Sequence, residues 1–272
     1  MDILNGAVAV ITGGASGIGL ATARNLASEG ARLVLADIEQ GPLDEAVAEF
    51  EGRGVDVLGV RTDVGDLASV QAMADAAWDR FGQVNVLFNN AGVALNGKIQ
   101  DMSHDDWEWS IRVNLWGVIH GVETFLPRML DDGHEGHIVS TASFAGLVPN
   151  SGLGVYCVTK YGVVALSECL WRDLRDTPIG ASVLCPMIVK TNIGQSARNR
   201  PDALGGAAVV KRRSPEEQEQ LSGGVIEAPE VADRVVRAIK NGELYILTHD
   251  DSREFIRRRF DRIDKSFDIG AL

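Results

Sequence analysis

The feature that most constrains the fold of this chain is a regular alternation of two kinds of segment. Short runs rich in apolar and β-branched residues recur, separated by stretches with helical periodicity. The predicted strands cover residues 7–12, 32–37, 55–61, 84–89, 137–141, 181–185 and 244–248. Between two of them, residues 65–81 carry apolar side chains at spacings of three and four, which predicts an amphipathic helix. Strands that alternate with such helices indicate βαβ units and a parallel sheet with right-handed crossovers.

The chain shows no internal division. No linker rich in proline, serine or charge interrupts it, and several predicted strands are almost wholly apolar, as expected when helices cover both faces of a sheet. We therefore predict an α/β fold over residues 1–272: a single Rossmann-type domain whose doubly wound parallel sheet has about seven strands, with helices on both faces. One irregular stretch, residues 189–227, is long for a compact domain and is predicted to be a substrate lid.

Composition and charge exclude several classes of protein. The net charge of −12 argues against nucleic acid as a partner, because such binding depends on lysine and arginine at phosphates. Two basic runs, residues 211–213 and 257–259, are interpreted as a solvated loop and a solvated helix face. No run of about twenty apolar residues predicts a membrane span, and the first residues do not have the pattern of a signal peptide. A cytoplasmic protein is expected.

The cysteines and histidines do not form a metal-binding or disulfide pattern. Cys157, Cys169 and Cys185 have no CxxC spacing, which fits a reducing compartment. The five histidines have no zinc-ligand spacing, although His134 and His137 lie close together in a glycine-rich turn. We expect no metal site.

A glycine-rich turn, residues 11–19, follows the first predicted strand and opens a helix. Its glycines have the spacing Gly-x-x-x-Gly-x-Gly. Glycine allows a sharp turn and a close approach of the backbone to a pyrophosphate, and the helix N-terminus supplies free N–H groups. The cofactor contacts predicted here are Gly13, Ser16, Gly17, Ile18 and Gly19.

Asp37 ends the second predicted strand and indicates which dinucleotide binds. A carboxylate at this position can accept hydrogen bonds from the adenosine ribose hydroxyls and would repel a 2′-phosphate. No lysine or arginine lies within residues 13–18, and Ile38 follows Asp37, so no cation for that phosphate is evident. The sequence favours NAD(H) over NADP(H).

Several short motifs stand in a fixed order along the chain. They are residues 12–19, Asp63-Val64, Asn89-Asn90-Ala91-Gly92, Asn114, Ser143 and Tyr156-Cys157-Val158-Thr159-Lys160. In this order and spacing they are highly specific, and the chain resembles the compact single-domain short-chain dehydrogenase/reductases over nearly its whole length. By position, the resemblance implies cofactor contacts at Asp63, Val64, Asn90, Ala91, Gly92, Pro186, Val189 and Thr191, and catalytic roles for Asn114, Ser143, Tyr156 and Lys160.

The resemblance also implies details of these roles. Asp63 and Val64 would contact the adenine, and Asn114 would lie in the middle of a helix and hold a water that leads to Lys160. Thr191 would bind the nicotinamide carboxamide. Met187 departs from the family, which usually has glycine after the proline that follows the sixth strand. Homo-oligomers, tetramers or dimers, are expected through the helices at residues 107–129 and 155–176.

Tyr156, Lys160 and Ser143 suit the oxidation of an alcohol by hydride transfer. The cofactor carries the hydride, while the protein must accept the hydroxyl proton. A free tyrosine has a pKa of ~10, which a nearby ammonium lowers. Tyr156 and Lys160 are four residues apart in a helical stretch and project from one face, so we expect Lys160 to lower the Tyr156 pKa and to hold the nicotinamide ribose. Ser143 can hydrogen-bond the substrate oxygen.

The substrate side is predicted to be apolar. The lid mixes aliphatic and polar side chains, and Leu95, Asn96, Phe144 and Met187 are expected beside the cleft. The sequence therefore favours a hydrophobic secondary alcohol or ketone, aromatic and alicyclic ones included. An NADPH-type ketone reductase and a non-catalytic nucleotide-binding regulator on the same fold are the alternatives. The Ser143, Tyr156 and Lys160 set favours the enzyme.

Overall fold

The structure of the protein, a computed structural model, describes residues 4–207 and 224–268. Its centre is a seven-stranded sheet in the order β3-β2-β1-β4-β5-β6-β9, in which every pairing is parallel. The strands are β1 (Val8–Thr12), β2 (Arg32–Asp37), β3 (Val57–Arg61), β4 (Val86–Asn89), β5 (Gly136–Thr141), β6 (Ile179–Cys185) and β9 (Tyr245–Leu247). Each of the seven predicted strands is present, with ends that differ by no more than about two residues. The predicted fold class is confirmed.

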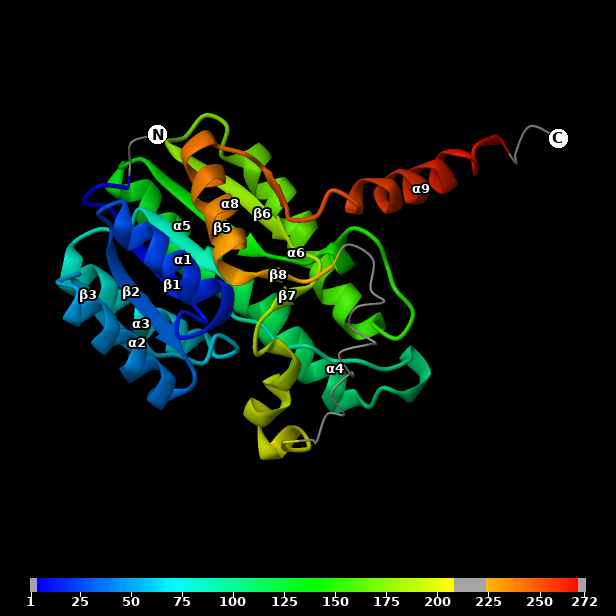
Figure 1. Cartoon of the computed structure of the whole chain (residues 1–272), viewed down its shortest axis with the longest axis horizontal. Helices are drawn as coiled ribbons and strands as arrows, with labels where there is room; N and C mark the ends of the chain where they lie inside the picture. The colour runs from blue at the N-terminus through cyan, green and yellow to red at the C-terminus, as the bar shows by residue number, and fades with distance from the viewer. Residues whose placement is uncertain (1–3, 208–223, 269–272) are drawn as a thin grey trace.

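Helices cover both faces of the sheet (Figure 1). They are α1 (Gly17–Ser28), α2 (Gln40–Gly52), α3 (Leu67–Phe81), α4 (His104–Ile111), α5 (Gly117–Asp132), α6 (Gly154–Asp173), α8 (Ala228–Asn241) and α9 (Ser252–Asp264). The helix predicted over residues 65–81 is confirmed as α3. Asp66 caps its first turn by accepting a hydrogen bond from Ala68 N at 3.3 Å, and Gly82, with φ +74°, ends it.

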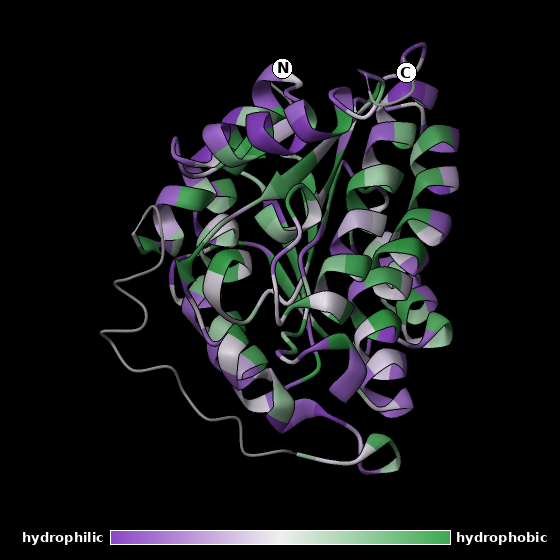
Figure 2. Ribbon diagram, turned by 90° about the vertical axis from the view of Figure 1, so that its right-hand side faces the viewer, coloured by the Kyte–Doolittle hydropathy of each residue, from purple (hydrophilic) through white to green (hydrophobic). Residues whose placement is uncertain are grey.

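Successive side chains along the strands point to opposite faces of the sheet and are buried in two separate cores. Ala9 and Ile11 of β1 pack with α1, α2 and α8 on one face, whereas Val8 and Val10 pack with α3, α5 and α6 on the other. In Figure 2 the strands of the sheet are predominantly green, between helices that carry both colours. Because both faces are covered, the central strands β1 and β4 are fully buried, whereas the edge strands β3 and β9 are partly exposed.

The helical stretch between β4 and β5 is interrupted. A π-helical turn, η2 (Arg112–Trp116), joins α4 to α5. The sequence predicts one continuous helix here, because a π turn adds a single residue and leaves no clear signal in the apolar pattern.

The predicted lid has regular structure where it is described. Two short strands, β7 (Val189–Lys190) and β8 (Ile226–Glu227), pair in parallel at its two ends, and 3-10 turns η4 (Ile193–Asn199) and η5 (Asp202–Leu204) follow β7. Residues 208–223, which include the basic run 211–213, lie outside the described residues. The second basic run, 257–259, lies on α9, which projects away from the rest of the molecule (Figure 1).

The α3/α5 packing provides a test of the core. Phe125 is fully buried, and its ring centroid lies 5.6 Å from that of Trp78. Phe125→Ala should lower the free energy of unfolding by about 3–5 kcal/mol, because it removes a large buried side chain and leaves a cavity. Phe260→Ala, at a ring that is 57% exposed on α9, is the control and should have little effect. Equal losses in urea unfolding would contradict this assignment of the core.

Candidate functional site

A cavity of about 220 Å³ runs along the carboxyl-terminal edge of the sheet. Its walls come from the segments that follow β1 to β6, together with α4, η2, α6, β7 and η4. Parallel sheets bind ligands at this edge. The predicted residues that line the cavity are Gly13, Ser16, Gly17, Ile18, Asp37, Asp63, Val64, Asn90, Ala91, Gly92, Ser143, Tyr156, Lys160, Pro186, Val189 and Thr191. Of the predicted catalytic and cofactor-binding residues, Gly19 and Asn114 are the two that do not line it.

The glycine-rich turn forms a cradle that side chains would fill. Gly13 and Gly17 have φ values of +61° and +53°, in the left-handed region that favours glycine. A Cβ atom at Gly13 would lie 3.0 Å from Ala91 Cα, and one at Gly17 would lie 3.2 Å from Thr191 Cγ2. Ser16, the N-cap of α1, makes no side-chain capping bond to any described residue. The first N–H groups of α1 therefore suit an anion such as a pyrophosphate.

Gly19 lies behind this turn and not on the cavity wall. A Cβ atom there would lie 2.2 Å from Gly13 O and 2.7 Å from Asn90 Nδ2. The prediction that Gly19 is a cofactor contact is not reproduced by the cavity lining. Its glycine is required because the first turn of α1 packs directly against the backbone of Gly13.

Asn90 and Thr12 connect the loop after β4 to the glycine-rich turn. Thr12 Oγ1 accepts hydrogen bonds from Asn90 N at 2.9 Å and from Ala91 N at 3.0 Å. In return, Asn90 Nδ2 donates to Thr12 O at 3.0 Å. These bonds fix the two loops relative to each other across the middle of the cavity.

Asp37 reaches the cavity from the end of β2. Its carboxylate accepts hydrogen bonds from Ala15 N at 3.2 Å and from Glu39 N at 3.1 Å. Burial raises the pKa of Asp37, while these backbone hydrogen bonds act in the opposite direction. The carboxylate is thus held at the wall by the phosphate turn on one side and the start of α2 on the other.

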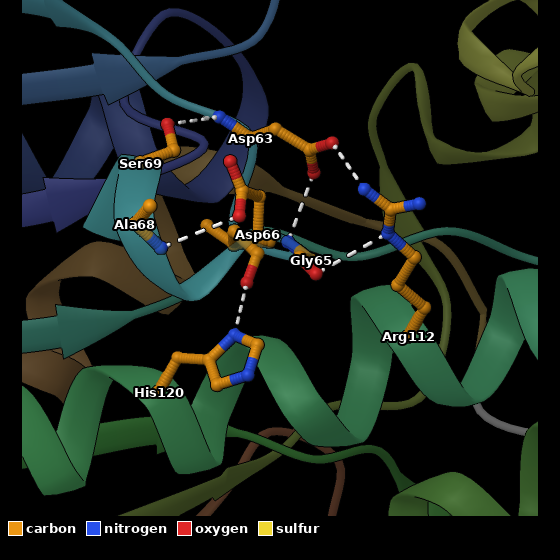
Figure 3. A network of polar contacts seen from close by, with 8 residues as sticks. Asp63, Gly65, Asp66, Ala68, Ser69, Arg112 and His120 are labelled. Atoms are coloured by element: carbon orange, nitrogen blue, oxygen red, sulfur yellow. Dashed lines mark hydrogen bonds and ion pairs between the residues drawn. The ribbon is translucent and has the colours of Figure 1, made fainter. Parts of the chain in front are cut away.

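Asp63 and Val64 are held by contacts with η2 and α5, and Figure 3 shows those of Asp63 with Gly65 and Arg112. Asp63 Oδ1 accepts from Gly65 N at 2.9 Å, and Asp63 Oδ2 pairs with the Arg112 guanidinium at 3.1 Å. His120 Nδ1 donates to Val64 O at 2.9 Å. The loop that the resemblance assigns to the adenine therefore has a fixed shape, set by η2 and α5.

Tyr156 and Lys160 lie one helical turn apart on α6 and both face the cavity. Lys160 is only 2% exposed, its Nζ donates to Thr141 O at 2.8 Å, and it lies 5.7 Å from the centroid of the Tyr156 ring. Burial lowers the pKa of Lys160 to about 8. Burial also raises the pKa of Tyr156 to about 12, and the hydrogen-bonding interaction with the Ser143 side chain lowers it. The expected lowering of the Tyr156 pKa by Lys160 is therefore not found, since burial dominates and Ser143 is the group that lowers the value.

Ser143 is oriented by the short turn that follows β5. Its Oγ accepts from Ala145 N at 3.2 Å and donates to Pro186 O at 3.4 Å. These contacts hold the hydroxyl between the segments after β5 and β6, beside Tyr156. The predicted position at the end of a strand is correct to within two residues.

Asn114 is fully buried in the π turn and lies behind the cavity wall. Its Oδ1 accepts from Val93 N at 2.8 Å, and its Nδ2 donates to Val93 O at 2.9 Å. A Cβ atom at Gly92 would lie 3.2 Å from Asn114 Oδ1 and 3.6 Å from Lys160 Nζ. Asn114 therefore holds the loop after β4 against α6, and the missing side chain at Gly92 keeps the space beside Lys160 open.

The remaining wall is largely apolar. Met187 lines the cavity as predicted, together with Val93, Trp109, Val113 and Ile193, whereas the predicted Leu95, Asn96 and Phe144 do not. Leu95 instead packs on the cluster that includes Trp109 and Leu204. The position of Trp109 at the cavity wall was not predicted, because it depends on the packing of α4 against α6 and η5.

Two further cavity residues, Glu39 and Arg198, form an ion pair at the Asp37 end. Neither was predicted, because a contact between α2 and the turn η4 depends on how the chain folds back over the sheet.

Within residues 4–207 and 224–268, no group of three or more metal-ligating side chains is present. No helix in the same ranges is long and apolar enough to cross a membrane.

Comparisons with known proteins agree with this architecture. A family model described as short chain dehydrogenase matches residues 7–202. A short-chain dehydrogenase/reductase from Burkholderia phymatum, solved in complex with NAD, has a TM-score of 0.91 and 41% identity, covering 98% of this chain and 97% of that one. The C alpha-dehydrogenase of Sphingobium sp. strain SYK-6 is 35% identical over 94% of this chain and 85% of its own length. The 1-deoxy-11-beta-hydroxypentalenate dehydrogenase of Streptomyces avermitilis is 34% identical over 96% and 91%, respectively.

The family model spans every residue that lines the cavity, and the Burkholderia phymatum relative covers 98% of the chain. With the fold and the order of the motifs, they lead to one conclusion: the chain belongs to the short-chain dehydrogenase/reductase family of oxidoreductases.

Proposed function

We propose that the protein is an NAD(H)-dependent oxidoreductase that interconverts a hydrophobic secondary alcohol and its ketone, with Tyr156 as the general acid/base. The observation that carries this proposal is the meeting of Ser143, Tyr156 and Lys160 at one end of a cavity whose other end holds the phosphate turn and Asp37. Such an arrangement supplies a proton-transfer group and a dinucleotide site in one space.

The residues present fit a dinucleotide. The cradle at Gly13 and Gly17 and the free N–H groups of α1 suit the pyrophosphate, and Asp37 suits the ribose hydroxyls. Ser16, Ile18, Asp63, Val64, Asn90, Ala91 and Gly92 would line the adenosine and central parts, and Pro186, Val189 and Thr191 the nicotinamide part. A bound nicotinamide would accept or donate the hydride. The NAD complex of the Burkholderia phymatum relative supports this choice of cofactor.

Tyr156 would move the proton at the substrate oxygen. In alcohol oxidation its phenolate takes the hydroxyl proton, and in ketone reduction its phenol returns one. Ser143, already oriented by Ala145 and Pro186, would hydrogen-bond the same oxygen and hold it near Tyr156. Lys160 would stabilise the phenolate and bind ribose hydroxyls through the donors that Thr141 does not use. Asn114 would act through the loop that it holds beside Lys160.

The apolar wall supports a hydrophobic substrate. Val93, Trp109, Val113, Met187 and Ile193 line the cavity beside the proposed catalytic end, and none of these side chains carries a charge. Aromatic and alicyclic alcohols fit such a wall, and the names of the two dehydrogenase relatives agree with oxidation as a direction. We further propose that residues 189–227 act as the substrate lid. We also propose that the protein forms homo-oligomers and that it is located in the cytoplasm.

Replacing the tyrosine tests this function directly. With a panel of apolar secondary alcohols and ketones, the wild type should turn over with NAD(H), and Tyr156→Phe should lower kcat/KM by roughly 10²–10⁴. Nicotinamide absorbance measures the rate, and NADH fluorescence should show that the dinucleotide still binds. Tyr161→Phe, whose hydroxyl donates to Leu147 O at 2.8 Å, is the matched control and should keep its activity. Turnover that survives in Tyr156→Phe would exclude the proposed acid/base.

The raised pKa of Tyr156 predicts how the rate depends on pH. Oxidation requires the phenolate, whose fraction increases with pH below a pKa of about 12, whereas reduction requires the phenol, which is already the main form. The rate of alcohol oxidation should therefore rise as the pH is increased from about 6, while ketone reduction should not rise. Stopped-flow measurement of the hydride step in both directions checks this. An oxidation rate that falls with pH would contradict it.

The burial of Lys160 predicts a cost in stability. The pKa of Lys160 is about 8 in the folded protein, against an ordinary value of 10.5. Between these two values the folded state binds fewer protons than the unfolded state. The loss in free energy of unfolding is therefore complete below pH 8 and disappears above pH 10.5. Lys160→Met should raise the free energy of unfolding at pH 7 by a net value of about 1–3 kcal/mol. This net value already includes the loss of about 1 kcal/mol from the hydrogen bond to Thr141.

Urea unfolding at pH 7 and pH 10 measures this difference, which should be smaller at the higher pH. Catalytic activity should be lost in the same variant. A variant that is less stable than the wild type at pH 7 would show that Lys160 is not held against a desolvation cost.

A further inference from the structure

Arg198 and Glu39 form a bidentate ion pair beside Asp37. Arg198 Nε donates to Glu39 Oε1 at 2.9 Å, and a terminal N–H of the guanidinium donates to Glu39 Oε2. The other terminal nitrogen donates to Gln195 O at 3.0 Å, within η4. Each nitrogen of the guanidinium therefore has a partner, and the Nε edge, one of the two edges that can bind an oxyanion in a bidentate way, is occupied by the Glu39 carboxylate.

The ion pair is next to the carboxylate that would bind the adenosine ribose. Asp37, Glu39 and Arg198 all line the cavity, and Glu39 N donates to Asp37 Oδ1 at 3.1 Å. Asp37 and Glu39 both raise the pKa of Arg198, so the three charges act on one another. A phosphate on the ribose 2′-oxygen would lie among two carboxylates and one arginine, and that arginine is already neutralised.

We propose that Glu39 is a specificity-determining residue that sustains the preference for NAD(H) by sequestering Arg198, the one described cavity arginine at the ribose end. The inference rests on the cofactor site proposed above and adds to it a second carboxylate with a different task. Asp37 would repel the 2′-phosphate directly. Glu39 would withhold the cation that could otherwise bind it.

The alternative role for the same pair is purely mechanical. It joins the start of α2 to η4, so it could simply keep η4 over the adenosine end of the cavity. The two roles predict different results. If the pair only fixes η4, then breaking it from either side weakens both dinucleotides alike. If Glu39 sequesters Arg198, then removing the glutamate charge and removing the arginine charge change NADPH binding in opposite directions.

The pair can be changed without endangering the fold. The side chains of Arg198 and Glu39 are 40% and 27% exposed, and ion pairs of this exposure contribute little to stability. A matched control exists further along α2, where Glu49 forms a similar bidentate pair with Arg24 of α1 and neither residue lines the cavity. Glu49→Gln removes the same charge at a comparable exposed pair.

The experiment measures the Kd of NADH and of NADPH by nicotinamide fluorescence, without substrate, for the wild type, Glu39→Gln, Arg198→Gln, the double variant and Glu49→Gln. Glu39→Gln should bind NADPH about tenfold more tightly, because a guanidinium edge is freed and one negative charge is lost, while NADH changes little. Arg198→Gln should bind NADPH no better than the wild type, and the double variant should lose most of the gain. Glu49→Gln should match the wild type.

An unchanged NADPH Kd in Glu39→Gln, an equal change for both dinucleotides, or a gain that persists in the double variant would overturn the inference. The failure of the proposed reaction is recognised separately. If NADH and NADPH bind as predicted but no alcohol or ketone is turned over, the specificity role stands and the catalytic proposal fails. If neither dinucleotide binds to any folded variant, the cofactor site itself is wrong and the inference fails with it.

Discussion

The site depends on the hydrogen bonds by which Thr12 accepts the two backbone N–H groups of Asn90 and Ala91. They lie where the strand order reverses, since β2 is on one side of β1 and β4 on the other. At such a point the crossovers run in opposite directions, and the loops after the two strands separate to leave a crevice. Thr12 fixes the width of that crevice. The glycine cradle on one side and the loop that leads to Asn114 and Lys160 on the other take their positions from it.

The Tyr156 end of the cavity contains one group that works against stability. Lys160 is buried with a single hydrogen bond to a carbonyl among the described residues, and burial lowers its pKa. A buried ammonium of this kind lowers the free energy of unfolding, whereas buried Asn114 is compensated by its hydrogen bonds to Val93. The two apolar cores offset this, because every strand from β1 to β6 is covered on at least one face by packed helices. The sheet is therefore rigid where the cavity needs fixed groups.

Much of this architecture could be read from local patterns. The strands, the phosphate turn, Asp37 and the Tyr156/Lys160 pair each depend on residues close in sequence, where periodicity, glycine spacing and helical geometry are sufficient. The features that were missed depend on distant contacts. Arg198 contacts Glu39 only because η4 returns to the start of α2. Gly19 lies behind the cavity wall because it packs against the backbone of Gly13. The strands β7 and β8 are too short for any pattern, and the pKa of Tyr156 follows from burial, which spacing alone does not give.

The π turn between α4 and α5 divides one long helical stretch into two parts with separate duties. The part before it carries Trp109 to the cavity wall, and the part after it packs Phe125 and Met129 on the sheet. The turn itself is fixed by the hydrogen bonds of Asn114 with Val93 and of Arg112 with Asp63. The position of each part therefore does not depend only on the packing of the other. α4 contacts α6 and η5, whereas α5 contacts α3, β4 and β5. The shape of the cavity wall at Trp109 and the support of the sheet are therefore set by different sets of neighbours, although they belong to one helical stretch.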